Sequence, residues 1–295
     1  MLEHLNSSSI PPARTVILGA RGFVGNALTR RLEADGAEIL ALGRQDLDLL
    51  AADAAERLAV ELRETDSLVV ISAKAPVKNH RMLTDNIEMM VAVCDALEKV
   101  TPAHVVYVSS DAVYADSDGP LDEASSAEPG ALHGAMHLTR ELMLGSVTDA
   151  PLAILRPSLL YGADDPHNGY GPNQYRRLAA EGRAIGLFGR GEERRDHVLI
   201  DDVAELIFRV LMRRSQGILN IATGEVTSFH EIADMVLGHF DGAAGIDYKP
   251  RSGPMPHNGY RPFASDACKA AFPDFTYTPI ADGIAKAHRD MMETA

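Results

Sequence analysis

Short apolar runs alternate with longer, periodically apolar segments through the first half of the chain. Continuous runs rich in β-branched residues predict buried strands, which we expect over 15–19, 38–42, 67–72, 104–109 and 152–156. Between these runs, apolar residues recur at helical spacing, which predicts helices over 23–34, 51–62, 86–100 and 132–144. Strands that alternate with helices in this way are typical of βαβ units. We therefore predict an α/β fold with a doubly wound parallel sheet and right-handed crossovers.

The character of the chain changes at about Tyr161. Residues 163–172 are polar and rich in glycine, and the stretch from Lys249 to Pro256 is rich in proline and glycine. We expect this less regular part to form a smaller region over the carboxyl ends of the strands, where open α/β sheets bind ligands. The expected division is a dinucleotide-binding domain over 14–165, to which about 195–222 returns, and a substrate-binding domain over 166–194 and 223–295.

Composition and charge exclude several classes of protein. The 28 basic and 42 acidic side chains give a net charge of −14, which disfavours a nucleic-acid partner. No apolar run approaches the ~20 residues of a membrane span.

Residues 1–13 are polar, contain Pro11-Pro12 and lack the basic start and apolar core of a signal peptide, so we expect a loose leader. Cys94 and Cys268 are far apart, which suggests neither a disulfide framework nor a cysteine metal site. We expect a cytoplasmic protein that binds no membrane.

A glycine motif, Gly19-Ala-Arg-Gly22-Phe-Val-Gly25, lies between the first predicted strand and the first predicted helix. In such a motif the first glycine permits a sharp turn, the second lets a pyrophosphate approach the backbone, and the third lets the helix pack closely on the sheet. The N–H groups and the dipole at the helix start favour an anion. A plain tight turn is the alternative, but the strand–turn–helix context predicts a Rossmann-like dinucleotide site.

The second predicted strand ends in Leu42-Gly43-Arg44 rather than in an acidic residue. An Asp or Glu at this point would bind the 2′-hydroxyl of NAD, whereas an Arg can pair with the 2′-phosphate of NADP. Asp46 and Asp48 follow closely, and a solvated Arg44 without a ligand is the other interpretation. The predicted cofactor is therefore NADP or NAD.

Three motifs carry a family resemblance: the glycine motif, Ser109-Ser-Asp-Ala-Val-Tyr114 and Arg195-Asp-His-Val-Leu-Ile-Asp-Asp-Val-Ala204. With them the chain resembles the extended short-chain dehydrogenase/reductases, the NAD-dependent epimerase/dehydratase family, over roughly 14–290. The resemblance implies a Rossmann domain, a small C-terminal domain that holds a nucleotide sugar, and a homodimer formed through two helices of each subunit. It also implies cofactor contacts at Gly19, Gly22, Phe23, Val24, Asp48, Leu49, Ala73 and Lys74, although Lys74 is unusual in a mostly apolar stretch.

The same resemblance implies roles for residues around the substrate. Ser110 matches the catalytic Ser or Thr that hydrogen-bonds the substrate oxygen, and Asp111 matches an Asp of 4,6-dehydratases and 4-dehydrorhamnose reductases. Ala112 stands where the dehydratases carry the Glu that removes a proton from C5, which argues against dehydration. The residues implied to contact the nucleotide diphosphate are Asn173, Arg195 and Arg251. A guanidinium fork suits a phosphate, and exposed loop arginines are the alternative.

The chain departs from the family at its Tyr-x-x-x-Lys signature, because the matching positions are His133 and His137. Residues four apart on a helix share a face, so we expect both imidazoles to point toward the cofactor. An imidazole titrates near ~6.5, so His133 could donate a proton to a carbonyl oxygen as hydride arrives. His137 could hydrogen-bond the nicotinamide ribose in place of the lysine.

Other interpretations of the two histidines stay open. They could bind a metal, although no third ligand is evident and we predict none. They could be purely structural, or the site could have lost redox chemistry and serve a non-catalytic nucleotide-binding or regulatory protein. We expect surface or packing roles for His167, His197 and His257, with a position near the substrate phosphates as the alternative for His197. The leading prediction is an NAD(P)-dependent oxidoreductase or epimerase of nucleotide-linked sugars, with keto-sugar reduction favoured by Arg44 and Ala112 and a non-catalytic nucleotide-binding protein as the alternative.

Overall fold

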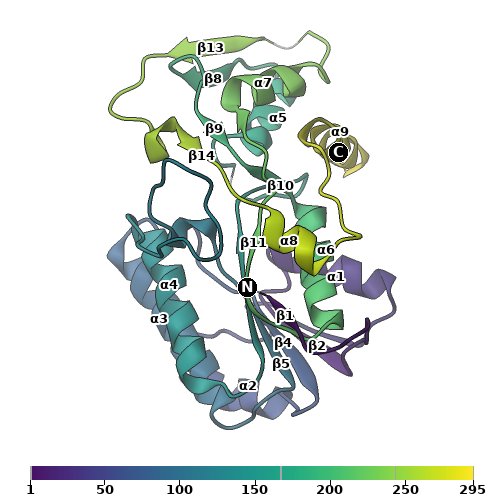
Figure 1. The fold of residues 1–295 in the computed structure, drawn as a ribbon. Helices are drawn as coiled ribbons and strands as arrows, with labels where there is room; N and C mark the ends of the chain where they lie inside the picture. Colours follow the sequence, from purple (N-terminus) through teal and green to yellow (C-terminus); the bar gives the residue numbers. More distant parts are fainter. Residues whose placement is uncertain (1, 167, 243, 295) are drawn as a thin grey trace.

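A seven-stranded sheet forms the centre of the lower half of the molecule (Figure 1). The structure, a computed structural model, describes residues 2–166, 168–242 and 244–294. The sheet has the strand order β1-β11-β6-β5-β4-β2-β3, and all neighbours are parallel except β1 and β11. Its strands are β1 (Glu3–His4), β2 (Arg14–Leu18), β3 (Ile39–Leu42), β4 (Asp66–Val70), β5 (His104–Val108), β6 (Leu152–Pro157) and β11 (Ser215–Ile221).

Helices cover both faces of this sheet. On one face lie α1 (Phe23–Ala34) and α6 (Ile200–Met212); on the other lie α2 (Ala54–Glu61), α3 (His80–Leu97) and α4 (Leu132–Val147). Each face has its own apolar core, and β2, β4 and β5 are buried along their whole length. Burial on both faces explains why these strands read as continuous apolar runs. The predicted α/β, Rossmann-like doubly wound sheet is confirmed.

The helix predicted over 86–100 begins earlier than expected. In the structure α3 starts at His80, because the side chain of Asn79 accepts a hydrogen bond from the backbone N of Met82 at 3.0 Å and caps the helix. The first turns of α3 are polar, so apolar periodicity alone did not reveal them.

The prediction of a loose leader was wrong. Glu3–His4 form β1, which pairs antiparallel with β11, and the backbone N of Ile10 donates to Met212 O at 2.9 Å. The His4 ring lies 2.7 Å from Ser215 Oγ and 2.8 Å from Ala271 O. These partners lie more than 200 residues away, so no local pattern could show them.

The upper part of the molecule is more regular than its loop-rich sequence suggested (Figure 1). Its helices are α5 (Pro172–Ala180), α7 (Phe229–Leu237) and α9 (Ile280–Thr294), while α8 (Asp266–Ala271) packs near β11. Short strands complete it: β7 (Leu159–Tyr161), β8 (Ile185–Phe188), β9 (Arg194–Arg195), β10 (His197–Leu199), β12 (Thr227–Ser228), β13 (Ile246–Lys249) and β14 (Tyr260–Arg261). A separate apolar core that includes Tyr175 and Phe229 holds this part together.

There are two short 3₁₀ helices, η1 (Asp111–Val113) and η2 (Pro256–Gly259), and His257 of η2 contacts Asp116 in the loop that follows η1. In the described ranges, none of the helices is both long enough and apolar enough to cross a membrane.

Candidate active site

A cavity of about 880 Å³ lies at the carboxyl ends of the parallel strands. Its walls come from the glycine turn, the ends of β3, β4 and β5, the start of α4, and segments of the upper part. The predicted site residues that line it are Gly19, Gly22, Phe23, Val24, Arg44, Asp48, Leu49, Ala73, Lys74, Ser110, Asp111, His133, His137, Asn173 and Arg195. Arg251 is the predicted residue that does not belong to this lining, as far as the described residues define it.

The glycine turn brings the backbone that follows β2 unusually close to the start of α1. Gly19 has φ +91°, and a Cβ there would lie 2.7 Å from Ser72 N. A Cβ on Gly25 would lie 2.1 Å from the carbonyl oxygen of Gly19, so α1 can pack this tightly only on a glycine. Gly22 is the N-cap of α1 and brings no capping side chain. The amides at this helix start therefore border the cavity and suit a pyrophosphate.

Two guanidinium groups stand at the rim of the cavity near the end of β3. Arg44 Nε lies 3.3 Å from Asp48 Oδ2, and Arg21 Nη2 lies 3.2 Å from Asp46 Oδ2. A Cβ on Gly43 would come within 2.7 Å of Arg21 Cδ, so Arg21 crosses the backbone directly after β3. Sequence reasoning singled out Arg44 but missed Arg21, which belongs to the glycine motif and meets β3 only in the fold.

The acidic partners of these arginines are held as carboxylates. Hydrogen bonds from the backbone N of Gly43 and of Leu50 lower the pKa of Asp46 and Asp48, respectively. Each Arg therefore carries a counter-ion that a phosphate would have to replace or accommodate.

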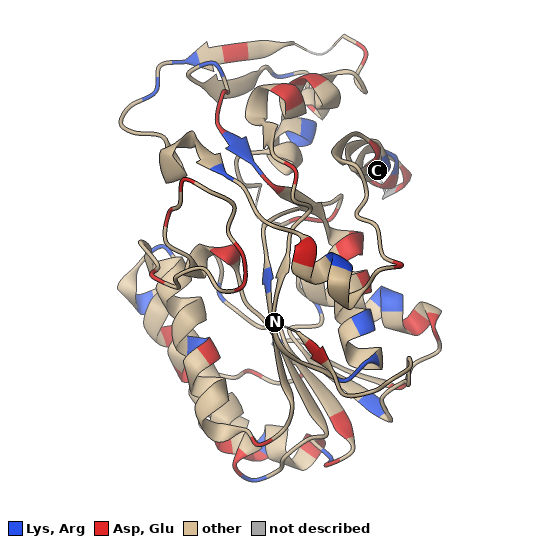
Figure 2. Cartoon of the chain, in the orientation of Figure 1, with Lys and Arg blue, Asp and Glu red and all other residues tan. Residues whose placement is uncertain are grey.

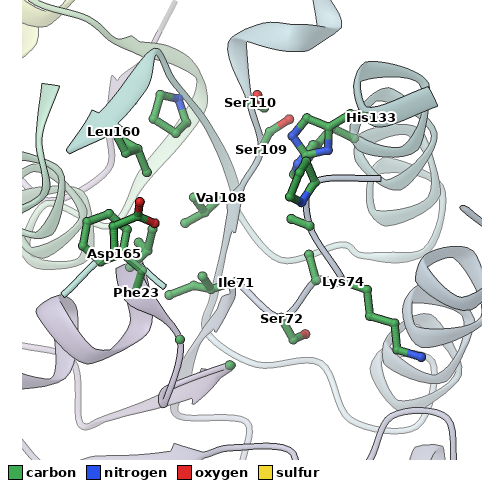
Figure 3. Close-up of a pocket in the computed structure, with 18 of the residues that line it drawn as sticks. Phe23, Ile71, Ser72, Lys74, Val108, Ser109, Ser110, His133, Leu160 and Asp165 are labelled. Atoms are coloured by element: carbon green, nitrogen blue, oxygen red, sulfur yellow. The ribbon is translucent and has the colours of Figure 1, made fainter. Parts of the chain in front are cut away.

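Lys74 lines the cavity mainly through its backbone. Its N donates to Asn86 Oδ1 at 2.9 Å and its O accepts from Asn86 Nδ2 at 3.0 Å, while its ammonium lies 2.7 Å from Asp85 Oδ2. Figure 3 shows the side chain running away from the centre of the cavity. The lysine thus bonds to α3, and its charge is turned away from the cavity.

Ser110 and Asp111 form the start of η1. Ser110 Oγ accepts from the backbone N of Ala112 at 3.2 Å and lies 3.4 Å from Asp111 Oδ1. Asp111 is bound by Arg261, which donates from Nε to Oδ2 at 3.0 Å and from Nη2 to the backbone O at 2.7 Å. Arg261 is only 2 % exposed and lies 150 residues away, so sequence reasoning missed it.

Helix α4 begins directly against η1. A Cβ on Gly134 would lie 1.9 Å from the carbonyl oxygen of Ala112, which places the first turn of α4 beside the Ser110 loop. His133 therefore lies on the same side of the cavity as Ser109 and Ser110, opposite Leu160 and Asp165 (Figure 3).

The two histidines of α4 differ in burial. Their ring centroids are 4.8 Å apart and the rings are nearly perpendicular. His133 is half-buried, whereas His137 is buried and its Nδ1 lies 2.8 Å from Tyr107 Oη. Burial lowers the pKa of His137 well below its usual value, and the charges of His133 and Arg140 lower it further. His137 is therefore neutral at physiological pH.

A buried polar network stands behind Ser110. Ser109 Oγ donates to Glu141 Oε1 at 2.5 Å, and Arg156 binds both oxygens of the same carboxylate at 3.0 and 2.5 Å. Arg156 also donates to Tyr114 Oη at 3.0 Å, which in turn donates to Asn220 at 2.7 Å. This network ties β5, β6 and α4 together, so it holds the active-site loop in place.

Glu193 organises the arginines of the upper wall. Arg195 Nε lies 2.8 Å from Glu193 Oε1 and lines the cavity, while Arg251 Nη1 lies 3.7 Å from the other oxygen. Arg251 also donates to the backbone O of Phe188 at 3.2 Å. In Figure 2 β9, which carries Arg195, is a continuous blue segment. Arg195 thus faces the cavity and Arg251 stands behind it.

Asn173 braces the loop before α5. Its Oδ1 accepts from the backbone N of Gly162 at 3.1 Å and from Arg176 at 3.2 Å, and its Nδ2 donates to Asp165 at 2.9 Å. The amide predicted to contact a diphosphate is therefore already engaged within the protein.

His197 and His257, expected in surface or packing roles, both line the cavity. His197 Nδ1 donates to the backbone O of Arg195 at 3.2 Å, and burial lowers its pKa to about 4. His257 has φ 49° in η2 and contacts Asp116 and Arg261; burial is the main cause of its lowered pKa. His167 lies outside the described residues.

Over the described ranges, no group of three metal-ligating side chains is gathered at one point.

Comparison with protein families gives a match over residues 15–222 to the NAD dependent epimerase/dehydratase family. Among curated proteins, the putative GDP-L-fucose synthase 2 of Oryza sativa subsp. japonica is 30% identical over 257 residues, covering 77% of this chain and 72% of the relative. The UDP-glucose 4-epimerase of Mycolicibacterium smegmatis is 27% identical over 259 residues, covering 76% and 82%, respectively.

Solved structures share the whole architecture. A GDP-L-fucose synthetase from Naegleria fowleri bound to NADP superposes with a TM-score of 0.83 at 16% identity, covering 99% of this chain and 97% of that chain. At this identity the likeness establishes the fold.

Proposed function

This chain belongs to the NAD dependent epimerase/dehydratase family, and we propose that it is an NADP- or NAD-dependent oxidoreductase that reduces a keto group of a nucleotide-linked sugar. One observation carries this proposal: the glycine turn and the pair Ser110 and His133 line one cavity at the carboxyl ends of the strands. Open α/β sheets bind their ligands at this edge.

The cavity fits a dinucleotide cofactor. Gly22 and the start of α1 would hold the pyrophosphate, since the N-cap residue is a glycine and no side chain caps the amides at the helix start. Phe23, Val24, Ala73 and the backbone of Lys74 would line the same channel, with Asp48 and Leu49 near the adenine and Arg44 near a 2′-phosphate. A reduced nicotinamide, when bound, would supply the hydride.

Ser110 and His133 would act on the carbonyl that is reduced. Ser110 Oγ would hydrogen-bond the carbonyl oxygen and hold it near His133. A protonated His133 would then give its proton to that oxygen as negative charge develops there. Asp111 is bound by Arg261, so we propose that it orients Ser110 and the substrate rather than transferring a proton. Ala112 carries no group that could remove a proton in a dehydration.

The diphosphate of the substrate would lie against Arg195. The epimerase relative is named for UDP-glucose and the synthase relative for GDP-L-fucose, which supports a sugar linked to a nucleoside diphosphate. We propose that residues 14–165 and about 195–222 serve the cofactor, and that residues 166–194 and 223–295 hold the substrate. Arg251 would act through Glu193 on Arg195, and Asn173 through the loop that it braces.

We further propose that the protein is a homodimer through α3 and α4, which pack side by side. Val91 on α3 is 43% exposed and Leu142 on α4 is 67% exposed. Light scattering behind a sizing column should give twice the chain mass of 31.8 kDa, and Leu142→Glu should give the monomer.

The test of function combines binding and turnover. NADPH and NADH are titrated by fluorescence, and a panel of 4-keto nucleotide sugars is then assayed with wild type, His133→Ala and His133→Tyr. We expect binding of at least one cofactor and a loss of turnover of ~100-fold or more in His133→Ala with little change in cofactor affinity. Cofactor binding without turnover of any sugar would favour the non-catalytic alternative, and no binding of either cofactor would reject both the oxidoreductase and its cofactor site.

A further inference from the structure

Tyr107 and Arg140 form a buried polar pair behind the two histidines. Tyr107 lies on β5 and Arg140 on α4, two turns after His133, and both side chains are fully buried. The guanidinium carbon of Arg140 lies 5.4 Å from the centroid of the Tyr107 ring. Its Nη2 donates to the backbone O of Ser72 at 2.9 Å. Ser72 lines the cavity, so this charge sits one residue behind the cavity wall.

The charge of Arg140 is not neutralised locally. Within the described part of the chain, its guanidinium donates to Met136 Sδ and to the backbone O of Ser72, its Nε has no hydrogen-bond partner, and no salt bridge is formed. Glu141, next to it in sequence, is bonded instead to Ser109 and Arg156. A fixed positive charge therefore remains beside Tyr107 and His137, where the interior screens it poorly.

The hydrogen bond between Tyr107 and His137 has one favourable direction. Tyr107 Oη lies 2.8 Å from His137 Nδ1, and this is the one acceptor within its reach among the described residues. If Nδ1 carried the proton, the buried hydroxyl proton of Tyr107 would have no acceptor, which is costly. The positive charge of Arg140 also attracts the hydroxyl oxygen and turns its hydrogen away, toward Nδ1.

Protonation states support this direction. Burial raises the pKa of Tyr107 to about 12, so the hydroxyl stays protonated and can act as a hydrogen-bond donor. Burial, with His133 and Arg140, keeps His137 neutral. A neutral imidazole that accepts at Nδ1 carries its proton on Nε2.

We propose that Tyr107 and Arg140 are positioning residues that hold His137 as the Nε2–H tautomer, so that His137 offers a hydrogen-bond donor, not a lone pair, to the cavity. Resting on the proposed function, the acceptor would be a ribose hydroxyl oxygen of the nicotinamide nucleotide. In this tautomer Nε2 cannot take a proton from His133, so His133 keeps its proton for the substrate.

The test is a nitrogen spectrum of the imidazole rings. Full-length protein labelled with ¹⁵N-histidine is examined by NMR without any ligand, and His137→Gln identifies the His137 signals among the 11 histidines. We expect Nε2 to show the shift of a protonated nitrogen and Nδ1 that of a hydrogen-bonded, unprotonated one. A protonated Nδ1 in wild type would overturn the proposal, whatever the variants do.

Tyr107→Phe removes the hydroxyl and keeps the ring. We expect its His137 Nδ1 signal to move toward the shift of an imidazole nitrogen without a donor, and the Kd for NADPH to rise about tenfold. Tyr161→Phe is the matched control, because Tyr161 is equally buried and its hydroxyl has no hydrogen-bond partner among the described residues. An unchanged His137 signal in Tyr107→Phe would also contradict the proposal.

The spectrum separates this inference from the proposed function. The Nε2–H tautomer without any binding of NADPH or NADH would leave the positioning roles standing and reject the cofactor site. Cofactor binding and turnover together with a protonated Nδ1 would support the proposed function and reject the positioning roles of Tyr107 and Arg140.

Discussion

Arg261 donates from Nε to Oδ2 of Asp111 over 3.0 Å, although 150 residues separate the two in the chain. The same guanidinium also binds the backbone O of Asp111, so β14 of the upper part holds η1 from above. This contact couples the position of Ser110 to the packing of the upper part on the sheet.

Replacement of Arg261 by Met should uncouple the two parts. The side chain of Asp111 is 15% exposed, and loss of its partner leaves a largely buried carboxylate unpaired. We expect a loss of about 3 kcal/mol in the free energy of unfolding, measured by urea denaturation, and a decrease in kcat. Asp111→Asn in the same chain should recover part of the stability, and purely additive losses in the double-mutant cycle would show that the pair does not interact.

Gly25→Ala should damage both the fold and cofactor binding. The added Cβ would meet backbone atoms, 2.1 Å from Gly19 O and 2.8 Å from Ala20 Cα, which cannot yield as a side chain would. We expect a loss of about 3 kcal/mol in the free energy of unfolding and weaker NADPH binding in a fluorescence titration. Gly145→Ala on α4 is the control: its Cβ would meet nothing within 4 Å, so a gain of up to about 1 kcal/mol is expected. Equal effects of the two changes would contradict the tight approach at Gly25.

Arg44→Ala should weaken NADPH binding more than NADH binding, by about tenfold, because a charge-assisted contact to the 2′-phosphate would be lost. Arg21→Ala is expected to act in the same direction, since both arginines line the same rim. Arg63→Ala removes a similarly exposed arginine, paired with Glu38 at 3.6 Å, and should leave both affinities unchanged. An equal loss for the two cofactors would reject the 2′-phosphate role.

The free energy of unfolding should decrease as the pH is lowered, because His104 is buried. Burial lowers its pKa to about 4, while its ordinary value is 6.5. In the unfolded chain His104 takes up a proton below about pH 6.5, whereas in the folded chain it does so only near pH 4. The stabilisation by neutral, buried His104 is therefore complete above pH 6.5 and is lost as the pH falls toward 4. The loss is on the order of 3 kcal/mol, and urea denaturation at several pH values measures it. His104→Gln should flatten the curve, and an unchanged slope would assign the effect to other groups.

The glycine motif, the strands and the helix that carries His133 were predictable because their signals are local. Turn, strand and helix around Gly19 are set by residues within a few positions, and apolar periodicity marked α4. The roles of Arg261 and Tyr107 were not predictable, since each depends on contacts made only when distant segments meet. Glu193 lies two residues from Arg195, but its second partner, Arg251, comes close only in the fold. Lys74 looked unusual in sequence because its counter-ion, Asp85, belongs to the polar first turns of α3, which apolar periodicity did not mark as helical.

The N-terminal strand β1 covers part of the edge strand β11 and so protects it from pairing with another molecule. Without β1, the first residues of β11 would form the rim of the sheet, and the backbone groups of Ser215 and Gln216 would be open to another molecule. Exposed rims of this kind template intermolecular pairing. A chain shortened by its first ten residues should therefore self-associate on storage even where its ligand affinities are normal.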